Sequence, residues 1–352
     1  MNFSSDNAYG AAPEILRAIQ AANDGAVPSY GDDPLTQRLA AEMARVFEHP
    51  VSVFPVISGT AANALALASV VPPHGAILCH SAAHIATDEC GAPEFFTHGA
   101  RVVTLGGALG KLRPEDVASR LAHFIHDCVH HSQPAAVSIS QCTELGTCYR
   151  PEETRLLADF AHRQGMKLHM DGARFANAVA HLGRAPAEAT WKAGVDVLSF
   201  GATKNGALGA EAVVFFNPDD AADFRFRRKR SGHLLSKMRF VSAQIVCALE
   251  QDRWLAWAAR ANALAGQLYT QLHNLPGVEI AWPVEANAMF AWLPEGMIAT
   301  LRAHGASFYE WAPPTGARTL VRLVTSFATP QSEIERFVEI ARDWAVKCGR
   351  AG

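Results

Sequence analysis

The sequence lacks the features that mark membrane, secreted and nucleic-acid-binding proteins. No apolar run reaches the roughly 18 residues that a membrane-spanning helix requires. The opening residues, MNFSSDNAYGAAPE, contain neither a basic start nor an apolar segment, so we expect no signal peptide. The net charge is only −3, from 31 basic and 34 acidic side chains, and this balance does not favour a nucleic acid or an anionic membrane as a partner.

The cysteines lack any pairing pattern. The seven cysteines are scattered along the chain and no two of them form a CxxC motif. We therefore interpret them as free thiols in a reducing cytoplasm. Histidines and one cysteine gather at HFIHDCVHHS (123–132), but no second group of ligands follows at regular spacing, so we expect no metal site.

The chain does contain enough apolar material for a large core, with 49% hydrophobic and 18% charged residues. Strand-like runs at 51–57, 75–80, 101–105, 135–140, 167–171, 195–200 and 210–216 alternate with helical patterns such as 59–71, 114–125 and 151–165. This alternation predicts an α/β fold with a mainly parallel sheet flanked by helices. Only a turn separates the last two strands, so at least one of them is expected to be antiparallel.

The pattern changes after about residue 240. A long helix is predicted over roughly 240–273, followed by strand-like segments and a final helix over 330–347. These elements predict a smaller C-terminal α+β domain. Because 352 residues are long for one core, we predict a large domain at 1–245 and a small domain at 246–352.

Two residues have the chemistry of a covalent cofactor site. Lys204 lies in a glycine-flanked turn, FGATKNG, between two apolar strands; a lysine in a dry site has a lowered pKa and forms Schiff bases with aldehydes. Asp171 ends the apolar strand LHMD, where a carboxylate can hold a proton on a heteroaromatic nitrogen. Taken alone, Lys204 also fits an exposed hairpin tip, and Asp171 also fits a helix N-cap.

Two further segments have the chemistry of anion binding. Ser58, Gly59 and Thr60 lie where a strand leads into a helix, and N–H groups and hydroxyls at a helix N-terminus bind phosphate. Arg322 lies in the strand-like run LVRLVTSF, and its guanidinium suits a carboxylate. Alone, the first segment also fits a simple helix cap, and the second fits an exposed arginine on an edge strand.

Together these four features describe one cofactor, pyridoxal 5′-phosphate. It needs an amine for its aldehyde, a carboxylate for its ring nitrogen and a cradle for its phosphate. The arginine then fits the carboxylate of an amino-acid substrate. The strand–helix alternation also fits a nicotinamide oxidoreductase, but no GxGxxG motif follows the first strand. A non-catalytic protein on the same fold is the third reading, although all the chemical positions are filled.

Six motifs resemble the low-specificity L-threonine aldolases and the phenylserine aldolases, which are pyridoxal-phosphate enzymes of fold type I. They are YGDD (30–33), SGTAAN (58–63), AAH (82–84), HMDGARFANA (169–178), FGATKNG (200–206) and RLVTSF (322–327). The resemblance covers nearly the whole chain in the same order. It implies the transferase-like fold and the cleavage of β-hydroxy-α-amino acids, such as threonine, allo-threonine or phenylserine, to glycine and an aldehyde. It also implies a homodimer or homotetramer whose active sites are shared between subunits.

The resemblance further implies a set of site residues. Lys204 forms the Schiff base, Asp171 pairs with the ring nitrogen and His84 stacks on the ring. The residues expected to contact the rest of the cofactor are Ser58, Gly59, Thr60, Thr143, Arg174 and, across a subunit interface, Arg228. The residues expected to bind the substrate are Ser5, Arg174, Arg322 and, from the neighbouring subunit, Tyr30.

One position departs from the resembled family. Many threonine aldolases carry a histidine after the fourth core strand, whereas here QCTELGT (141–147) brings Glu144 near that position. We therefore expect His84 to take the proton of the substrate's β-hydroxyl group, directly or through water. Another pyridoxal-phosphate lyase or an aminotransferase that acts on a small amino acid is the alternative, because such enzymes use the same lysine and aspartate.

Overall fold

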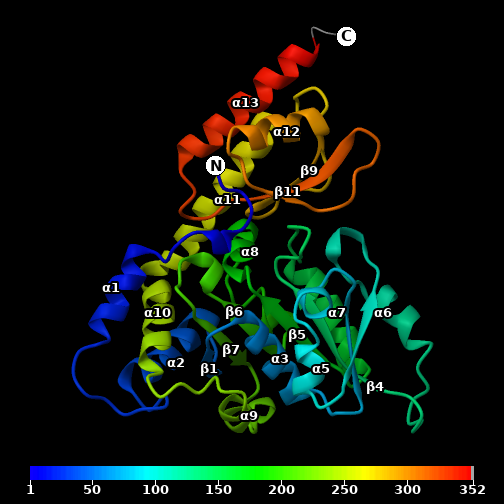
Figure 1. Ribbon diagram of the computed structural model, residues 1–352. Coiled ribbons are helices and arrows are strands. Elements are labelled where there is room, and N and C mark those ends of the chain that lie inside the picture. The colour runs from blue at the N-terminus through cyan, green and yellow to red at the C-terminus, as the bar shows by residue number, and fades with distance from the viewer. Residues whose placement is uncertain (350–352) are drawn as a thin grey trace.

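The structure, a computed structural model, describes residues 1–349 and contains two sheets, each with its own hydrophobic core (Figure 1). The larger sheet has seven strands in the order β1-β7-β6-β5-β4-β2-β3. Its strands are β1 Ser52–Val56, β2 Gly75–His80, β3 Arg101–Leu105, β4 Gln133–Ser140, β5 Lys167–Gly172, β6 Val197–Gly201 and β7 Glu211–Phe215. Strand β7 runs antiparallel to β1 and β6, and the neighbouring pairs from β6 to β3 are parallel. The predicted α/β fold and the antiparallel partner of the last strand pair are therefore confirmed.

Helices cover both faces of this sheet, which explains why strands such as β2 (GAILCH) are mostly apolar. Strands β2, β6 and β7 are buried at every residue, as expected for strands covered on both sides. The helices of this part are α1 Pro13–Ala21, α2 Pro34–Phe47, α3 Gly59–Val70, α4 His84–Thr87, α5 Ala92–Phe96, α6 Pro114–Leu121, α7 Pro151–Arg163, α8 Phe175–Leu182, α9 Phe224–Arg230 and α10 Arg239–Leu249. Within residues 1–349, no helix has both the length and the apolar character that a membrane crossing requires.

The smaller sheet is antiparallel, with the order β10-β11-β9-β8, and forms the predicted C-terminal α+β domain. Its strands are β8 Glu279–Ile280, β9 Ala288–Pro294, β10 Tyr309–Glu310 and β11 Arg318–Val324, and its helices are α12 Glu295–Ala303 and α13 Gln331–Gly349. The N-terminal segment joins this domain, because the buried ring of Phe3 packs edge-on against Phe337. Figure 1 shows the chain start beside the small domain, far from the base of the large one.

The single long helix predicted over 240–273 is wrong. Helix α10 ends at Leu249, and α11 spans Arg253–Leu272. Gln251 and Asp252 separate them with φ values of +55° and +52°, and a right-handed helix cannot continue through residues in that conformation. The predicted boundary at 245/246 falls inside α10, whose buried residues on both sides belong to the large-domain core. The two cores meet instead along α11, which contributes Trp254 to the large core and Leu268 to the small one.

Candidate active site

Lys204 lies in a turn that several buried contacts hold in place. It is the middle residue of a 3₁₀ turn, Thr203–Asn205, between β6 and β7. The Asn205 amide donates to the Trp254 carbonyl at 2.8 Å, and the Ala202 N–H donates to the Glu211 carboxylate at 3.1 Å. Gly206 follows with φ +99°, and a Cβ there would lie 3.0 Å from the Trp257 ring, so only glycine fits without a shift.

The Lys204 amine has the character of a nucleophile. Burial lowers its pKa most, and the Arg174 guanidinium lowers it further, although Asp6, Asp171 and Glu211 oppose the shift. No hydrogen bond or ion pair of Nζ is found among residues 1–349. A larger fraction of this amine is therefore neutral near pH 7 than for an exposed lysine, which is the form that attacks an aldehyde.

Asp171 faces the same pocket from the carboxyl end of β5. The residue is 6% exposed, and its carboxylate accepts a hydrogen bond from the Asn63 amide at 2.8 Å and from the Ala173 N–H at 2.9 Å. The pocket is lined by Gly59, Asn63, His84, Glu89, Ser140, Cys142, Glu144, Asp171, Ala173, Arg174 and Lys204. The sequence-predicted lysine and aspartate thus line one cavity, at the edge of the sheet where parallel α/β proteins bind ligands.

A chain of side chains that the motifs did not single out connects Asp171 with His84. The Asn63 amide also donates to Glu89 Oε1 at 2.9 Å, and the same oxygen accepts from His84 Nδ1 at 2.8 Å. The bond to Glu89 is the main cause that raises the pKa of His84, and burial raises the pKa of Glu89. The pair fixes the His84 ring at the pocket, and it favours the protonated form of that ring.

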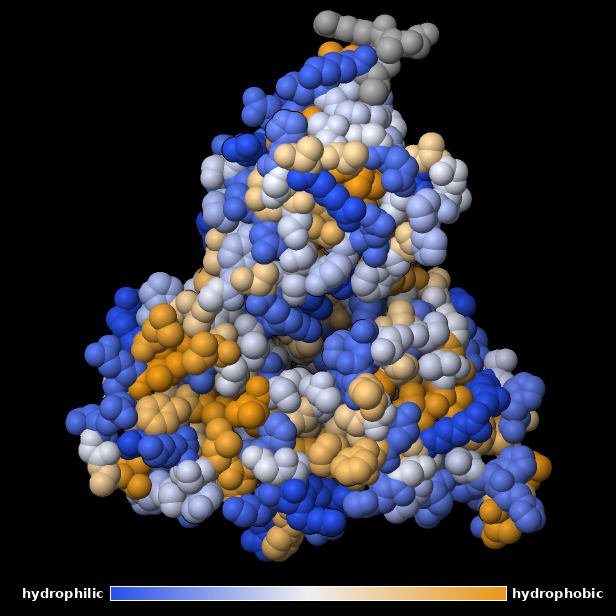
Figure 2. Space-filling model, in the orientation of Figure 1, coloured by the Kyte–Doolittle hydropathy of each residue, from blue (hydrophilic) through white to orange (hydrophobic). Residues whose placement is uncertain are grey.

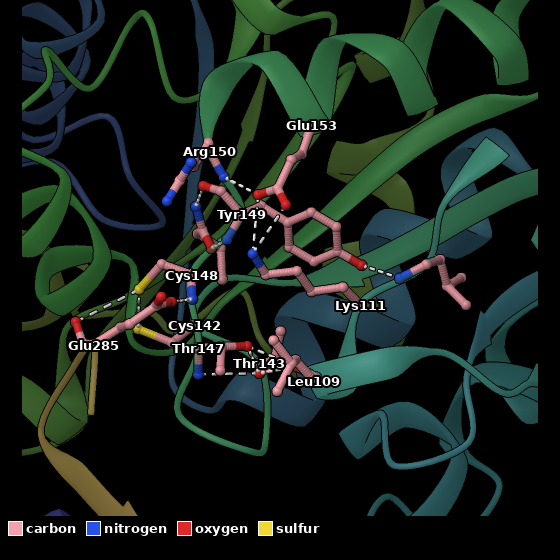
Figure 3. Close-up of polar contacts among 12 residues, drawn as sticks. Leu109, Lys111, Cys142, Thr143, Thr147, Cys148, Tyr149, Arg150, Glu153 and Glu285 are labelled. Atoms are coloured by element: carbon pink, nitrogen blue, oxygen red, sulfur yellow. Dashed lines mark hydrogen bonds and ion pairs between the residues drawn. The ribbon is translucent and has the colours of Figure 1, made fainter. Parts of the chain in front are cut away.

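The loop after β4 brings Glu144 to the pocket. Its Oε1 accepts from the His84 backbone N–H at 2.9 Å and from the Ser140 hydroxyl at 2.6 Å, while Oε2 is buried without a partner. Burial raises the pKa of this carboxyl. The neighbouring Thr143 hydroxyl instead contacts Thr147 and the Leu109 carbonyl, at 2.8 and 3.2 Å (Figure 3). Thr143 therefore stabilises the loop and does not line the cavity that holds Lys204.

Two arginines lie beside the pocket and differ in how many of their hydrogen-bond donors are occupied. Arg174 forms an ion pair with buried Asp6, with Nε 2.7 Å from Oδ2 and Nη2 3.0 Å from Oδ1. Arg322 comes from β11 of the small domain and packs over the Tyr309 and Trp311 rings. Within residues 1–349, the one hydrogen bond that it donates goes to the Ser4 carbonyl, at 3.3 Å. Its Nε is buried without a partner, and burial lowers its pKa. Of the two, Arg322 has more of its donors available for a carboxylate.

Arg322 lines a second pocket that adjoins the first. Its lining includes residues of both domains, such as Arg174 from the large domain and Asn287 and Ala288 from the small one. Cys142, Glu144 and Arg174 line both cavities. Figure 2 shows the surface hollowed at the junction of the two domains. Ser5 belongs to the same region, because it precedes Asp6 and its hydroxyl lies 3.5 Å from the Asp6 carboxylate.

The predicted phosphate cradle lies at the start of α3. Ser58 is exposed and its hydroxyl accepts from the Ala61 N–H at 3.3 Å, so it does cap the helix. Gly59 is the first helical residue and lines the pocket. No acidic residue occurs in this first turn, so the partial positive charge of the helix N-terminus and the N–H groups near Gly59 and Thr60 can bind an anion.

The two residues predicted to act across a subunit interface lie outside this chain's own pocket. Arg228 is 8% exposed, packs over the Phe54 ring and donates to the Pro55 carbonyl at 3.3 Å. Tyr30 is 47% exposed, and the Lys229 ammonium lies 4.7 Å from its ring centre. The contact of either residue with the cofactor or the substrate of a neighbouring subunit stays a prediction.

Asn63, Glu89 and Asp6 are the polar site residues that the sequence reasoning missed. Asn63 had a usable signal, because it lies four residues after Gly59 and helical periodicity brings positions i and i+4 to one face. Asp6 had none, since its partner Arg174 lies 168 residues away. Glu89 also lies outside any motif, and only folding brings it to Asn63 and His84.

The residues present fit the predicted cofactor. An amine without a hydrogen bond, a buried carboxylate and a helix N-terminus line one cavity. Three buried polar atoms of the lining have no hydrogen-bond partner in the described part of the chain, namely Asn63 Oδ1, Glu89 Oε2 and Glu144 Oε2. Buried polar atoms without partners cost about 1–3 kcal/mol each, so their concentration here indicates a ligand site and not a structural core.

Known proteins resemble the chain over nearly its full length. A family model described as Beta-eliminating lyase matches residues 2–295. A low-specificity L-threonine aldolase of Pseudomonas aeruginosa is 44% identical over 341 residues, which are 97% of this chain and 96% of that protein. Another, from a Pseudomonas sp. strain, is 45% identical over 316 residues, or 90% and 91% of the two chains. A solved threonine aldolase of Leishmania major superposes with a TM-score of 0.92 at 29% identity, covering 98% of this chain and 99% of the other.

Proposed function

The chain belongs to the Beta-eliminating lyase family, and from this premise we propose that it is a pyridoxal 5′-phosphate-dependent carbon–carbon lyase. It cleaves β-hydroxy-α-amino acids, with threonine, allo-threonine and phenylserine as the expected substrates, to glycine and an aldehyde. The relatives named low-specificity L-threonine aldolases support this reaction. The observation that carries the proposal is that Lys204 and Asp171 line the same pocket.

Pyridoxal phosphate, when bound, supplies an electron sink for the pair of the breaking carbon–carbon bond. Lys204 would bond to its aldehyde, since the lowered pKa keeps part of the amine neutral. Asp171 would face the ring nitrogen, with both carboxylate oxygens already fixed by Asn63 and the Ala173 N–H. His84 would cover the ring, held there through Glu89. The start of α3 would hold the phosphate.

The substrate carboxylate would bind Arg322, which has a buried Nε without a partner. Arg174 would support this contact from the large domain, because Asp6 holds its guanidinium in place. Ser5, which precedes Asp6 in the chain, would bind the substrate in the same region. A fixed carboxylate fixes the orientation of the Cα–Cβ bond, and orientation of the reacting bond is a large part of catalysis. Because Arg322 comes from the small domain, closure of that domain on the substrate would also exclude water.

We also propose that the enzyme is a homodimer or homotetramer with shared sites. Apolar surface gathers on the α1 side of the large domain (Figure 2). Near the start of α3, Ile57 is 42% exposed and Leu208 is 64% exposed, which suits a surface covered by a second copy. The free thiols of Cys79, Cys90, Cys128, Cys142, Cys148 and Cys247 support a reducing compartment, and we place the enzyme in the cytoplasm as part of the same proposal.

Mixing two defective variants tests the shared site. Tyr30→Ala and Lys204→Ala are each expected to lack activity, because one removes a side chain offered to the neighbour and the other removes the lysine of the chain's own site. A mixed dimer has one complete site, so an exchanged equal mixture is expected to recover up to about a quarter of the wild-type rate. No recovery, in a mixture shown to contain mixed dimers, contradicts a role of Tyr30 across the interface.

The reaction itself is tested by its products. Purified protein with pyridoxal phosphate is incubated with L-threonine or L-phenylserine, and glycine and the aldehyde are measured. Equal amounts of glycine and aldehyde are expected, with none from Lys204→Ala. Release of ammonia with a keto acid, or transfer of the amino group to an added keto acid, would instead favour the alternative of another pyridoxal-phosphate lyase or an aminotransferase.

A further inference from the structure

We propose that Glu144 is the catalytic base that takes the β-hydroxyl proton of the substrate, a role that the sequence had suggested for His84. The inference rests on the proposed function and adds the residue that starts bond cleavage. Four observations carry it: the position of Glu144, its unpartnered oxygen, the fixed loop that holds it and its electrostatic surroundings.

Glu144 lies where the two parts of the substrate site meet. A substrate whose amine reaches the Lys204 side and whose carboxylate reaches Arg322 has its α- and β-carbons between the two pockets. Of the three residues that line both pockets, Arg174 cannot accept a proton, and the Cys142 thiol donates to the Arg174 carbonyl at 3.6 Å. Of these three shared residues, Glu144 is therefore the one whose carboxylate can accept the proton.

The two carboxylate oxygens of Glu144 differ in their hydrogen bonding. Oε1 is occupied by the His84 N–H and the Ser140 hydroxyl, which orient the carboxyl group. Oε2 is buried and has no partner among residues 1–349. A buried acceptor without a donor is costly, and the β-hydroxyl of a bound substrate would supply the missing hydrogen bond. A proton acceptor must reach the proton by such a bond.

The loop that carries Glu144 is anchored on both sides of it (Figure 3). Thr147 Oγ1 donates to the Leu109 carbonyl at 2.6 Å, and the Thr143 N–H donates to the Thr147 carbonyl at 2.8 Å. The Cys148 N–H donates to the Glu285 carboxylate at 2.7 Å, which ties the loop to the small domain. Contacts of this kind hold a catalytic group in position before the substrate arrives.

The surroundings of Glu144 suit a base that works near neutral pH. Burial raises its pKa most and nearby Asp171 raises it further, whereas the bonds from Ser140 and His84 oppose the shift. A base is most effective when its pKa lies near the working pH, so a raised carboxyl pKa is an advantage. The charged or titratable groups that face this region or interact electrostatically with Glu144 are Cys79, His84, Glu89, Cys142, Tyr149, Asp171, Arg174, Lys204 and Arg322.

His84 is less available as a proton acceptor in this arrangement. Its Nδ1–H is held by Glu89, and that bond raises the pKa of the ring, so less of the neutral base is present at a given pH. Its backbone N–H orients Glu144. His84 thus keeps its predicted place over the cofactor ring and positions the base through its main chain.

Glu144 Oε2 takes the hydroxyl proton, and the electron pair of the O–H bond forms the second bond of the aldehyde C=O group. The pair of the breaking Cα–Cβ bond stays on Cα. The Lys204 ammonium then protonates Cα, which gives glycine. Glu144 releases its proton to water, which restores the carboxylate, and Lys204 regains a proton from water. Glycine and the aldehyde together contain all atoms of the substrate.

Glu144→Gln tests the assignment with little change of shape, because its amide oxygen can still accept from His84 and Ser140. The turnover of threonine or phenylserine is expected to fall by about 10²- to 10⁴-fold, the usual contribution of a general base. Exchange of the glycine α-hydrogen with deuterated water, followed by NMR, needs Lys204 but no β-hydroxyl base, and it is expected to remain. Glu152→Gln, an exposed change on α7, is the control and should leave both rates unchanged.

Two further measurements separate a chemical role from a structural one. Glu144→Ala leaves a space, and added formate is expected to restore part of its cleavage rate. In cofactor-free protein, infrared spectra should contain a band of a protonated buried carboxyl group that disappears with rising pH and is missing in Glu144→Gln. Thermal melting of each variant checks that it is folded.

The outcomes distinguish the inference from the proposed function. Full cleavage by Glu144→Gln, or an equal loss of cleavage and glycine exchange without rescue by formate in Glu144→Ala, overturns the role of Glu144 and leaves the proposed function standing. A wild-type protein that releases no glycine overturns both. Loss of cleavage with retained glycine exchange supports both.

Discussion

The amide of Asn63 donates to the Asp171 carboxylate at 2.8 Å and thereby connects the third helix with the fifth strand at the bottom of the pocket. Its second N–H donates to Glu89 at 2.9 Å, so one neutral side chain orients two buried carboxylates. Hydrogen bonds from the same amide group therefore hold Asp171 and Glu89 in fixed positions on either side of Asn63. This arrangement also makes Asn63 a positioning residue whose effect should be visible in catalysis.

Asn63→Leu is expected to lower both turnover and cofactor affinity. Leucine has a similar size but removes both donors, leaving Asp171 and Glu89 each short of a hydrogen bond. A lost bond to a buried charged group costs about 1.5–3 kcal/mol, which corresponds to an effect of about 10- to 100-fold. Steady-state kinetics and cofactor titration measure it. Asn177→Leu, which breaks the bond from Asn177 to Asn262 outside the pocket, should lower stability without that kinetic effect.

Arg322→Lys is expected to raise KM for the amino acid by about 10-fold or more with a smaller effect on protein stability, because lysine cannot form the paired hydrogen bonds of a guanidinium. Arg318→Lys on the same strand is a matched control, since Arg318 is exposed and pairs with Glu279 at 2.7 Å. Equal KM values for the wild type and Arg322→Lys would remove Arg322 from the substrate site.

Gly206→Ala is expected to destabilise the protein by about 1–3 kcal/mol, because the new methyl group would press on the Trp257 ring and φ is +99°. Gly232→Ala separates the two causes, since Gly232 has φ +79° but no atom lies within 4 Å of the place that a Cβ would take there. It should cost only about 1 kcal/mol. Urea unfolding measures both, and an equal loss in the two variants would contradict a steric role of Trp257.

His162 is expected to stabilise the fold more in acid than in base. Its Nε2 lies 2.8 Å from the Asp196 carboxylate, and this bond raises the pKa of His162 above its ordinary value of 6.5, although burial opposes the shift. A raised folded-state pKa gives stability that is full below 6.5 and is lost as the pH rises through the folded-state value.

His162→Gln should therefore lower the free energy of unfolding more at about pH 5.5 than at about pH 8.5. The measurement is urea unfolding of both proteins at the two pH values. The exposed His181 on α8 provides the comparison, because no carboxylate pairs with it within residues 1–349, and the loss at about pH 5.5 should be larger for His162→Gln than for His181→Gln. A loss for His162→Gln that is the same at both pH values would refute the effect.

The sequence predicts those parts of the fold that local patterns determine. The buried strand Gly75–His80 is apolar up to its last residue, and a turn too short for a crossover predicted that at least one of the last two strands is antiparallel. In the structure this strand is Glu211–Phe215. The break at Gln251 and Asp252 was missed, because neither residue is a glycine or proline and only tertiary packing holds them at positive φ.

The candidate site, like the fold, was predictable only where local sequence patterns determine it. Lys204 and Asp171 could be found because each lies within a motif, Lys204 in the turn after a strand and Asp171 near the end of one. The pairing of Arg174 with Asp6 could not, since it joins residues 168 positions apart, and it leaves Arg322 as the less occupied arginine. The state of Glu144 also needed the structure, because burial and an unpartnered oxygen cannot be read from residue order.

The most direct test is to locate the covalent attachment of the cofactor. The protein is loaded with pyridoxal phosphate, reduced with borohydride, digested and analysed by mass spectrometry, with Lys204→Ala treated in parallel. We predict that the wild-type cofactor mass is found on the peptide that contains Lys204 and that the variant retains none. Attachment to a different lysine, or no attachment in a folded wild-type protein, would contradict the account.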